Sequence, residues 1–286
     1  MSMSDKARAL ALKQRLAPST DGRRQLLTVP GCYDAFSALL IAQAGFDTAF
    51  VTGSGVSMTR LGRPDIGLVS LTDLANIVRC MRERVDIALI VDGDTGFGNA
   101  LNMNHTVRIL ERAGATAIQI EDQLFPKRCG HMPGKQVIPI KEAQGKVKAA
   151  VDARVDTLIF ARTDALAIDG LNAALDRAEI YLEAGCDALF IEGPRTMDEI
   201  FAISKRFAHR VPLIHNLLEG GITPTRSSSE IAKLGFAMTL HPLMLLLGFA
   251  QMAPQLLNHL KAQGDTSSIE SELGGLATIN SLVDQA

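Results

Sequence analysis

The sequence predicts a (β/α)8 barrel, and three observations support this fold class. A unit in which an amphipathic run ends at a glycine, followed by a short apolar run, recurs at 41–51, 111–120, 181–191 and 231–240. Eight apolar runs alternate with eight helical patterns along a chain of 286 residues, which is long enough for one such barrel. No glycine-rich dinucleotide-binding motif follows the first apolar run, which disfavours a doubly wound sheet, the alternative fold.

Each part of the repeated unit has a physical reason. Glycine just past a helix supplies the left-handed turn that ends it, and the β-branched apolar runs have the length of buried parallel strands. The predicted strands lie near 27–30, 47–52, 87–92, 117–121, 157–162, 188–192, 212–216 and 236–240. The predicted helices lie near 34–44, 72–84, 101–113, 141–153, 171–184, 196–208, 227–234 and 243–262. We expect one domain over 1–286, with a helical tail from about 263 that contains a short helix around 267–284 and packs on a partner subunit.

The composition excludes several classes of protein. Lys and Arg number 29 against 31 Asp and Glu, so the chain lacks the basic balance typical of a nucleic-acid binder. The apolar runs are too short to span a membrane, and the first residues lack the apolar segment of a secretory signal, so we expect a cytoplasmic protein. The spacing of the four cysteines fits neither a disulfide framework nor a zinc site.

Charged and polar residues follow most of the predicted strands. In this fold the active site lies where the strands end and the following loops begin. The strands end in Asp92-Gly93-Asp94, Glu121-Asp122, Arg162-Thr163-Asp164, Glu192 and His215-Asn216. Capping of the next helix would explain Thr163 and Asp164, but Arg162 and Glu121 still lie within apolar runs. These positions therefore predict one shared site rather than a set of structural polar residues.

The acidic members of this set predict a metal site. The candidate ligands are Asp65, Asp92, Asp94 and Glu121. Oxygen ligands without His or Cys suit Mg²⁺, with Mn²⁺ as the alternative ion. Carboxylates brought together without a cation would raise one another's pKa values and lower stability. The competing interpretation is a set of helix-cap and salt-bridge acids.

The loop at 125–139 has the composition of an active-site lid. It carries Lys127, Arg128, Cys129, His131 and Lys135, with Gly130 and Gly134 as potential hinges. Its prolines and glycines prevent a helix, and the cations should lower the pKa of the Cys129 thiol. A solvated basic loop with an incidental cysteine is the alternative. Residues 52–55, TGSG, offer closely spaced backbone N–H groups that suit a carboxylate or a phosphonate.

These residues together resemble the isocitrate lyase and phosphoenolpyruvate mutase superfamily over roughly residues 25–262. The motifs are GCYDAFSA (31–38), TGSG (52–55), LGRPD (61–65), DGDTGFGN (92–99), IEDQ (120–123), KRCGH (127–131), ARTDA (161–165) and NLLEGG (216–221). KRCGH is similar to the loop motif of the lyase branch. The resemblance implies a Mg²⁺-dependent barrel that acts on small 2-oxo or 2-hydroxy acids, usually as a homotetramer whose last helix is exchanged between subunits.

The resemblance also implies roles for the individual residues. Asp94 would bind Mg²⁺ directly, and Asp65, Asp92 and Glu121 would bind it partly through water. The substrate-binding residues would be Thr52, Ser54, Gly55, Lys127, Arg128, Gly130, Glu192 and Asn216. Cys129 would be the general acid, with Arg162 and His131 as further catalytic residues. Phe50 stands where the related lyases carry a tyrosine, so Tyr33 is the remaining candidate for the base.

The reaction implied by this resemblance is a retro-aldol cleavage of a 2-hydroxy dicarboxylate to pyruvate and a carboxylate. Met244 stands where the methylisocitrate lyases have a serine that helps to bind a distal carboxylate, and a thioether there favours an apolar substituent. The turn at 219–221 resembles that of the dimethylmalate lyase and carboxyphosphonoenolpyruvate mutase branches. We therefore expect an alkyl-substituted malate such as 2,3-dimethylmalate. Four alternatives stay open. They are a methylisocitrate lyase, a carboxyphosphonoenolpyruvate phosphonomutase, an oxaloacetate hydrolase or decarboxylase, and a catalytically silent binding barrel.

Overall fold

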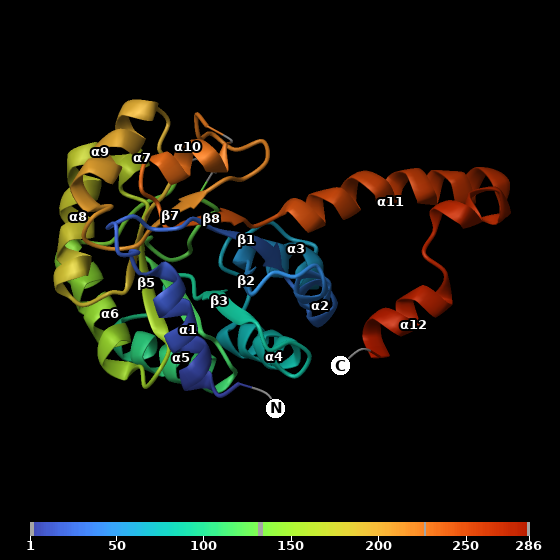
Figure 1. Cartoon of the computed structure of the whole chain (residues 1–286), viewed down its shortest axis with the longest axis horizontal. Helices are drawn as coiled ribbons and strands as arrows, with labels where there is room; N and C mark the ends of the chain where they lie inside the picture. Colours follow the sequence, from blue (N-terminus) through green and yellow to red (C-terminus); the bar gives the residue numbers. More distant parts are fainter. Residues whose placement is uncertain (1–2, 131–133, 226, 285–286) are drawn as a thin grey trace.

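Eight parallel strands form a closed barrel in chain order, which confirms the predicted fold class (Figure 1). The structure is a computed structural model that describes residues 3–130, 134–225 and 227–284. The strands are β1 (Leu27–Cys32), β2 (Thr48–Val51), β3 (Ala88–Asp92), β4 (Ala117–Glu121), β5 (Leu158–Thr163), β6 (Ala188–Ile191), β7 (Leu213–Asn216) and β8 (Met238–His241). Strand β1 pairs with β8 and closes the barrel. All eight predicted strands are present, with ends within two residues of those expected.

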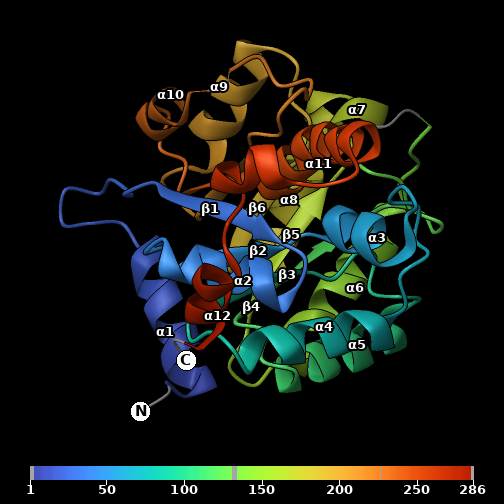
Figure 2. The ribbon, with the colours of Figure 1, turned by 90° about the vertical axis from the view of Figure 1, so that its right-hand side faces the viewer.

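The eight predicted helices are also present, and all but the last lie around the barrel (Figure 2). They are α2 (Ala35–Gln43), α4 (Leu71–Arg82), α5 (Ala100–Arg112), α6 (Ile140–Ala153), α8 (Leu171–Glu183), α9 (Met197–Phe207), α10 (Ser228–Lys233) and α11 (Met244–Gln263). The four glycines of the repeated unit, at 45, 114, 185 and 235, have φ angles of 86°, 105°, 95° and 80°. They therefore adopt the left-handed conformation that the sequence pattern predicts.

Three helices were not predicted: α1 (Asp5–Leu16), α3 (Gly53–Leu61) and the single turn α7 (Leu166–Asp169). The prediction of one short helix in the tail was wrong in detail. The tail contains a 3₁₀ segment, η1 (Ser267–Glu272), and a separate helix, α12 (Leu276–Asp284). The turn between them contains Gly274 and Gly275, which disfavour a continuous helix.

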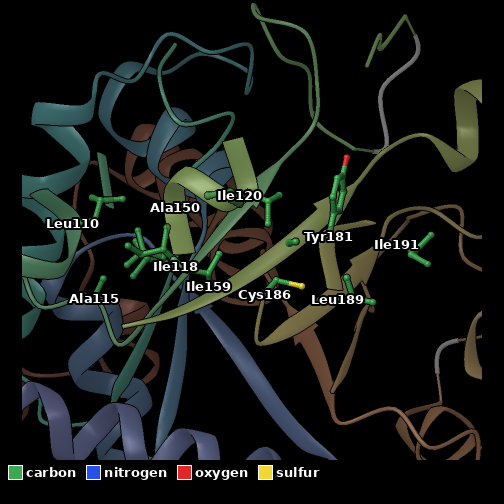
Figure 3. Packing of buried hydrophobic residues seen from close by; sticks show 14 of the residues in the cluster. Leu110, Ala115, Ile118, Ile120, Ala150, Ile159, Tyr181, Cys186, Leu189 and Ile191 are labelled. Carbon is green, nitrogen blue, oxygen red and sulfur yellow. The ribbon is translucent and has the colours of Figure 1, made fainter. Parts of the chain in front are cut away.

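Two apolar clusters hold the barrel together. One lies between the strands and the outer helices, where Leu110 of α5, Ala150 of α6 and Tyr181 of α8 pack with strand residues such as Ile118 and Ile159 (Figure 3). The other cluster fills the barrel interior with residues that include Val29, Ile90 and Phe160. This alternation of neighbouring strand residues between two faces follows from the period of two in a β-strand.

Helix α1 extends the interior cluster at one end of the barrel. Its residues Leu12 and Leu16 are 3% and 2% exposed, and both belong to the cluster that fills the barrel. The side chain of Arg15 donates to the backbone carbonyls of Gln25 and Leu26, just before β1. Helix α1 therefore lies at the amino end of the strands, opposite the rim where the polar residues gather.

The C-terminal helices differ from the rest of the chain in their exposure. Helix α11 projects away from the barrel and has no buried residue, and the chain then returns through α12 (Figure 1). The Gln43 side chain of α2 donates to the carbonyl of Leu282 in α12, at 2.7 Å. Among the described residues, no helix combines the length and apolar character needed to cross a membrane.

We predict that Leu16→Ala lowers the free energy of unfolding by about 2–5 kcal/mol, because it leaves a cavity in the barrel interior. Leu10→Ala is the matched control on the same helix, since Leu10 is 53% exposed, and its effect should stay within about 0.5 kcal/mol. Both are measured by urea denaturation at one protein concentration. Equal effects of the two substitutions would show that α1 does not pack in the barrel.

Candidate active site

The carboxyl ends of the strands and the loop after β4 surround one cavity, which brings together most of the predicted site residues. Those that line it are Thr52, Ser54, Asp65, Asp92, Glu121, Lys127, Arg128, Cys129, Gly130, Arg162, Glu192 and Asn216. Because the strands are parallel, residues far apart in the chain meet at this rim. Asp94 lies behind the lining, in contact with Lys127. His131 lies outside the described residues.

Lys127 occupies the centre of the carboxylate cluster. Its Nζ lies 2.6 Å from Asp65 Oδ1 and 2.5 Å from Asp94 Oδ1, and the residue is 3% exposed. We expected Lys127 to bind substrate, whereas its ammonium pairs with these acids. In the described part of the chain, no three carboxylate, imidazole or thiol groups are placed to ligate one ion. The ammonium thus provides part of the positive charge that the cluster requires.

The cluster nevertheless retains more negative charge than Lys127 compensates. Burial, together with the nearby charges of Asp92 and Asp65, raises the pKa of Asp94 to about 7, although Lys127 opposes this rise. Burial also raises the pKa of Glu121 well above its usual range, although Arg162 and Lys127 oppose this rise. One oxygen of Glu121, Oε1, is buried and has no hydrogen-bond partner among the described residues. A hard divalent cation fits this set of buried oxygen donors, because burial raises the pKa values of Asp94 and Glu121 and a bound cation would favour their ionised forms.

The segment TGSG, whose backbone N–H groups were expected to suit an anion, begins helix α3. Thr52 is the N-cap residue, and its hydroxyl accepts the N–H of Gly55 at 3.3 Å. Ser54 lines the cavity, and its buried Oγ has no hydrogen-bond partner within the described part of the chain. A helix N-terminus carries partial positive charge and favours anions. The helix N-terminus therefore provides a structural basis for the expected affinity of this segment for a carboxylate.

Arg162 is held by carboxylates on several sides. Its Nε and Nη2 donate to the two oxygens of Asp164 at 2.9 and 3.1 Å, and its guanidinium also lies near Glu121 and Glu192. The prediction that Asp164 caps a helix was wrong, because its carboxylate binds Arg162 and Lys135 instead. Although burial opposes ionisation, these two cations lower the pKa of Asp164 to about 2. Thr163 does bond locally, since its Oγ accepts the N–H of Ala165.

The loop after β4 is anchored on both sides of Cys129. The Cys129 N–H donates to the carbonyl of Asp65 at 3.1 Å, and Lys135 Nζ donates to the carbonyl of Gly130 at 2.6 Å. The amide group of Gln123 exchanges two hydrogen bonds with the backbone of Arg128. The half-buried Cys129 lines the cavity together with the carboxylate cluster and Arg162.

The geometry does not place Tyr33, the candidate base, or Met244, the expected apolar contact, in the described lining of the cavity. Tyr33, the candidate base, lies beside Gly55 and does not belong to the described lining of the cavity. Burial raises the pKa of Tyr33, which makes its phenolate less available. Met244 was expected to provide an apolar contact, but it is 45% exposed and lies outside the described lining. The apolar lining comes instead from Phe50, Phe190, Leu218, Leu240, Pro242 and Leu243.

Comparison with known proteins identifies the family. The phosphoenolpyruvate phosphomutase family model matches residues 20–253. The chain belongs to this family. It is 38% identical to 2,3-dimethylmalate lyase of Eubacterium barkeri, over 96% of this chain and 93% of the relative. It is 41% identical to chloroplastic carboxyvinyl-carboxyphosphonate phosphorylmutase of Arabidopsis thaliana, over 91% of this chain and 78% of the relative.

Solved structures of the phosphoenolpyruvate mutase and isocitrate lyase superfamily share the fold. A crystal structure of 2,3-dimethylmalate lyase matches with a TM-score of 0.90 and 28% identity, covering 96% of this chain and 91% of that one. A structure of oxaloacetate acetylhydrolase matches with a TM-score of 0.88 and 29% identity, covering 96% and 93%. The resemblance inferred from the motifs is confirmed, and the protein is an enzyme of this superfamily.

We predict an acid-sensitive contribution to stability from His215, which is buried on β7 and whose Nε2 has no hydrogen-bond partner in residues 3–130, 134–225 and 227–284. Burial lowers the pKa of His215 to about 4. The unfolded chain therefore binds a proton between about pH 6.5 and 4 that the folded protein does not, and stability falls as pH falls through this range. The total loss is on the order of 3 kcal/mol.

The measurement is the free energy of unfolding against pH for the native protein and His215→Gln. Between pH 6.5 and 4, the native curve should descend more steeply than that of the variant. His209→Gln is the control, because His209 is exposed. Parallel curves for the native protein and His215→Gln would rule out the contribution of His215.

Proposed function

We propose that the protein is a Mg²⁺-dependent carbon–carbon lyase that cleaves an alkyl-substituted malate, such as 2,3-dimethylmalate, to pyruvate and a carboxylate. One observation carries this proposal: a single cavity combines a buried carboxylate cluster, Arg162, the Cys129 thiol and an apolar wall. The 38% identity to a 2,3-dimethylmalate lyase supports the same reaction.

Charge favours a divalent cation in this site. The buried acids are Asp65, Asp92, Asp94, Glu121, Asp164 and Glu192, whereas the buried cations are Lys127, Lys135 and Arg162. A dicarboxylate would be repelled by this excess of negative charge. Asp65, Asp92, Asp94 and Glu121 would hold Mg²⁺, or Mn²⁺ as the alternative. When bound, the ion supplies positive charge that attracts the substrate and polarises its oxygen atoms.

Different residues of the chain would bind the two halves of the substrate. Ser54, the N-terminus of α3 and Arg162 would bind the carboxylate of the pyruvate half, because they offer an unpartnered hydroxyl and positive charge. Arg128, Gly130, His131, Glu192 and Asn216 would contact the other half. The proposed substrate-binding residues also include Thr52, Gly55 and Lys127.

The cleavage requires one proton to leave and one to arrive. A base, for which Tyr33 is the candidate, takes the proton of the 2-hydroxyl group as the bond between C2 and C3 breaks. The C2–O bond becomes the carbonyl of pyruvate, and the electron pair of the broken bond remains on C3, next to its carboxylate. The Cys129 thiol then donates a proton to C3 and completes the second product.

The apolar wall favours alkyl substituents over a third carboxylate. Leu218, Leu240 and Leu243 provide no polar side-chain group to bind such a carboxylate, and Phe50 and Phe190 extend the same apolar lining. Burial of methyl groups against these residues would be favourable. A phosphonomutase is the second candidate, because the identity to the Arabidopsis thaliana relative is 41%.

We also propose that the protein is a cytoplasmic homotetramer that binds a small-molecule substrate and neither nucleic acid nor membrane. Helix α11 supports the oligomer, because it has 20 residues and none of them is buried. Its exposed apolar side chains include Leu247, Phe249, Met252, Leu257 and Leu260. An apolar helix of this length favours a protein partner, and exchange of α11 between subunits would cover it.

The lyase proposal is tested by incubation of the purified protein with Mg²⁺ and each of five compounds. These are 2,3-dimethylmalate, 2-methylisocitrate, isocitrate, oxaloacetate and carboxyphosphonoenolpyruvate. We expect release of pyruvate from 2,3-dimethylmalate, and its loss when a chelator removes the metal. Cys129→Ala should lower kcat by about 10²- to 10⁴-fold, the usual contribution of a general acid. Cys80→Ala is the matched control, because Cys80 is exposed on α4.

Different failures of this experiment have different meanings. Faster cleavage of 2-methylisocitrate than of 2,3-dimethylmalate would contradict the proposed alkyl specificity. Turnover of oxaloacetate or of the phosphonate alone would refute the lyase reaction. An equal loss of activity in Cys80→Ala and Cys129→Ala would remove the assignment of Cys129 as proton donor.

We predict that Phe249→Asp reduces the size of the assembly, because a buried unpaired carboxylate would oppose packing of α11. Phe249 is 65% exposed in the single chain. Phe201→Asp is the matched control, since Phe201 is 57% exposed on α9. Light scattering after size-exclusion chromatography measures the mass. A tetramer in both variants would show that α11 does not mediate assembly through this residue.

A further inference from the structure

Lys135 is a buried lysine that the proposed chemistry does not use. Its side chain is only 4% exposed, and it lies outside the described lining of the cavity. Its Nζ donates to the Gly130 carbonyl at 2.6 Å and to Asp164 Oδ1 at 2.8 Å. Burial of an ammonium group costs free energy unless close partners compensate it. The two contacts of Lys135 therefore indicate its role, which is to join the loop backbone at Gly130 to the Asp164 carboxylate.

Asp164, which accepts a hydrogen bond from Lys135, is itself held by neighbouring groups. It is fully buried, and its backbone N–H donates to Asp122 Oδ1 at 2.9 Å. Asp122 in turn accepts hydrogen bonds from the hydroxyl groups of Thr163 and Tyr181, both at 2.7 Å. The Asp164 carboxylate, positioned in this way, binds Arg162 through both of its oxygens.

The backbone next to Cys129 packs directly on Arg162. A Cβ atom at Gly130 would lie 2.4 Å from Arg162 Nη2 and 2.8 Å from Glu192 Cγ, so the loop backbone approaches the guanidinium as closely as only glycine permits. Lys135 holds the Gly130 carbonyl, and the Asp65 carbonyl holds the Cys129 N–H. The backbone that carries the Cys129 thiol is thus anchored on both sides of the residue.

We propose that Lys135 and Asp164 are positioning residues that act as one unit, fixing the Cys129–Gly130 backbone against Arg162. The unit holds the proton donor and the carboxylate-binding guanidinium in a constant relative position. Misplacement of a reacting group by about 1 Å can lower the rate about 10²-fold, so the hydrogen bonds of Lys135 matter for the rate. The catalytic part of this proposal rests on the proposed lyase function; the geometric part does not.

The geometric part is tested by amide hydrogen exchange in Lys135→Met, which keeps an apolar side chain but removes the ammonium. The amides of Arg128 and Cys129 are bonded to Gln123 and Asp65, so their exchange reports on the anchored loop. We expect exchange at these amides to become at least about 10-fold faster. Lys148→Met is the matched control, because Lys148 forms an exposed pair with Asp152 on α6. Unchanged exchange in Lys135→Met would overturn the proposal.

The catalytic part is tested by kinetics on 2,3-dimethylmalate. Lys135→Met should lower kcat about 10- to 100-fold with little change in KM, and Asp164→Asn should lower it similarly. If Lys135 acts through the thiol, Lys135→Met should cause little further loss when it is added to Cys129→Ala. A merely structural role predicts the same loss in both backgrounds, and that result, or a loss confined to KM, would refute positioning.

The two readouts separate this proposal from the proposed function. If the native protein does not cleave any malate in the panel, the lyase assignment fails. The hydrogen-exchange comparison of Lys135→Met with Lys148→Met then still decides whether the unit holds the loop.

Discussion

An excess of buried negative charge at the carboxyl end of the barrel constrains the rest of the site. Two of the three buried cations there contact more than one carboxylate: Lys127 contacts Asp65 and Asp94, and Arg162 contacts Asp164, Glu121 and Glu192. Loss of one buried cation would leave its partners uncompensated, which costs several kcal/mol in typical proteins. The same excess of negative charge favours binding of a divalent cation. The buried carboxylates that destabilise the fold are therefore the groups that the proposed chemistry uses.

The barrel tolerates this buried charge because two apolar clusters provide its stability. The interior cluster runs from Leu12 and Leu16 of α1 to Phe160 and Phe190 on the strands, and the second cluster surrounds it. Both clusters are apolar, and α1 lies at the amino end. Phe190 belongs to the interior cluster and also lines the cavity, so the apolar core continues into the wall that would contact an alkyl substituent.

The sequence predicted those parts of the molecule that local patterns determine. The glycines at 45, 114, 185 and 235 marked helix ends because left-handed backbone favours glycine wherever it occurs. Helix α1 was missed because its burial depends on Leu12 and Leu16 entering the barrel, which no local pattern shows. Helix α3 was missed because two glycines in its first turn resemble a loop. The gathering of polar residues at one rim was predictable, but the pairing of Lys127 with Asp65 and of Lys135 with Asp164 was not, because both depend on how the loop after β4 folds back.

Asp65 connects the two halves of the site. Its carboxylate contacts Lys127 in the acidic cluster, and its carbonyl accepts the N–H of Cys129 on the loop. On the other side of the thiol, Lys135 joins the Gly130 carbonyl to Asp164 and hence to Arg162. The acidic cluster proposed to hold the ion, the guanidinium proposed to bind the substrate carboxylate, and the residue that carries the proton-donating thiol are therefore linked through hydrogen bonds, ion pairs and the intervening backbone. Since neighbours in such a network are energetically coupled, a change of charge in the acidic cluster also bears on the position of the thiol.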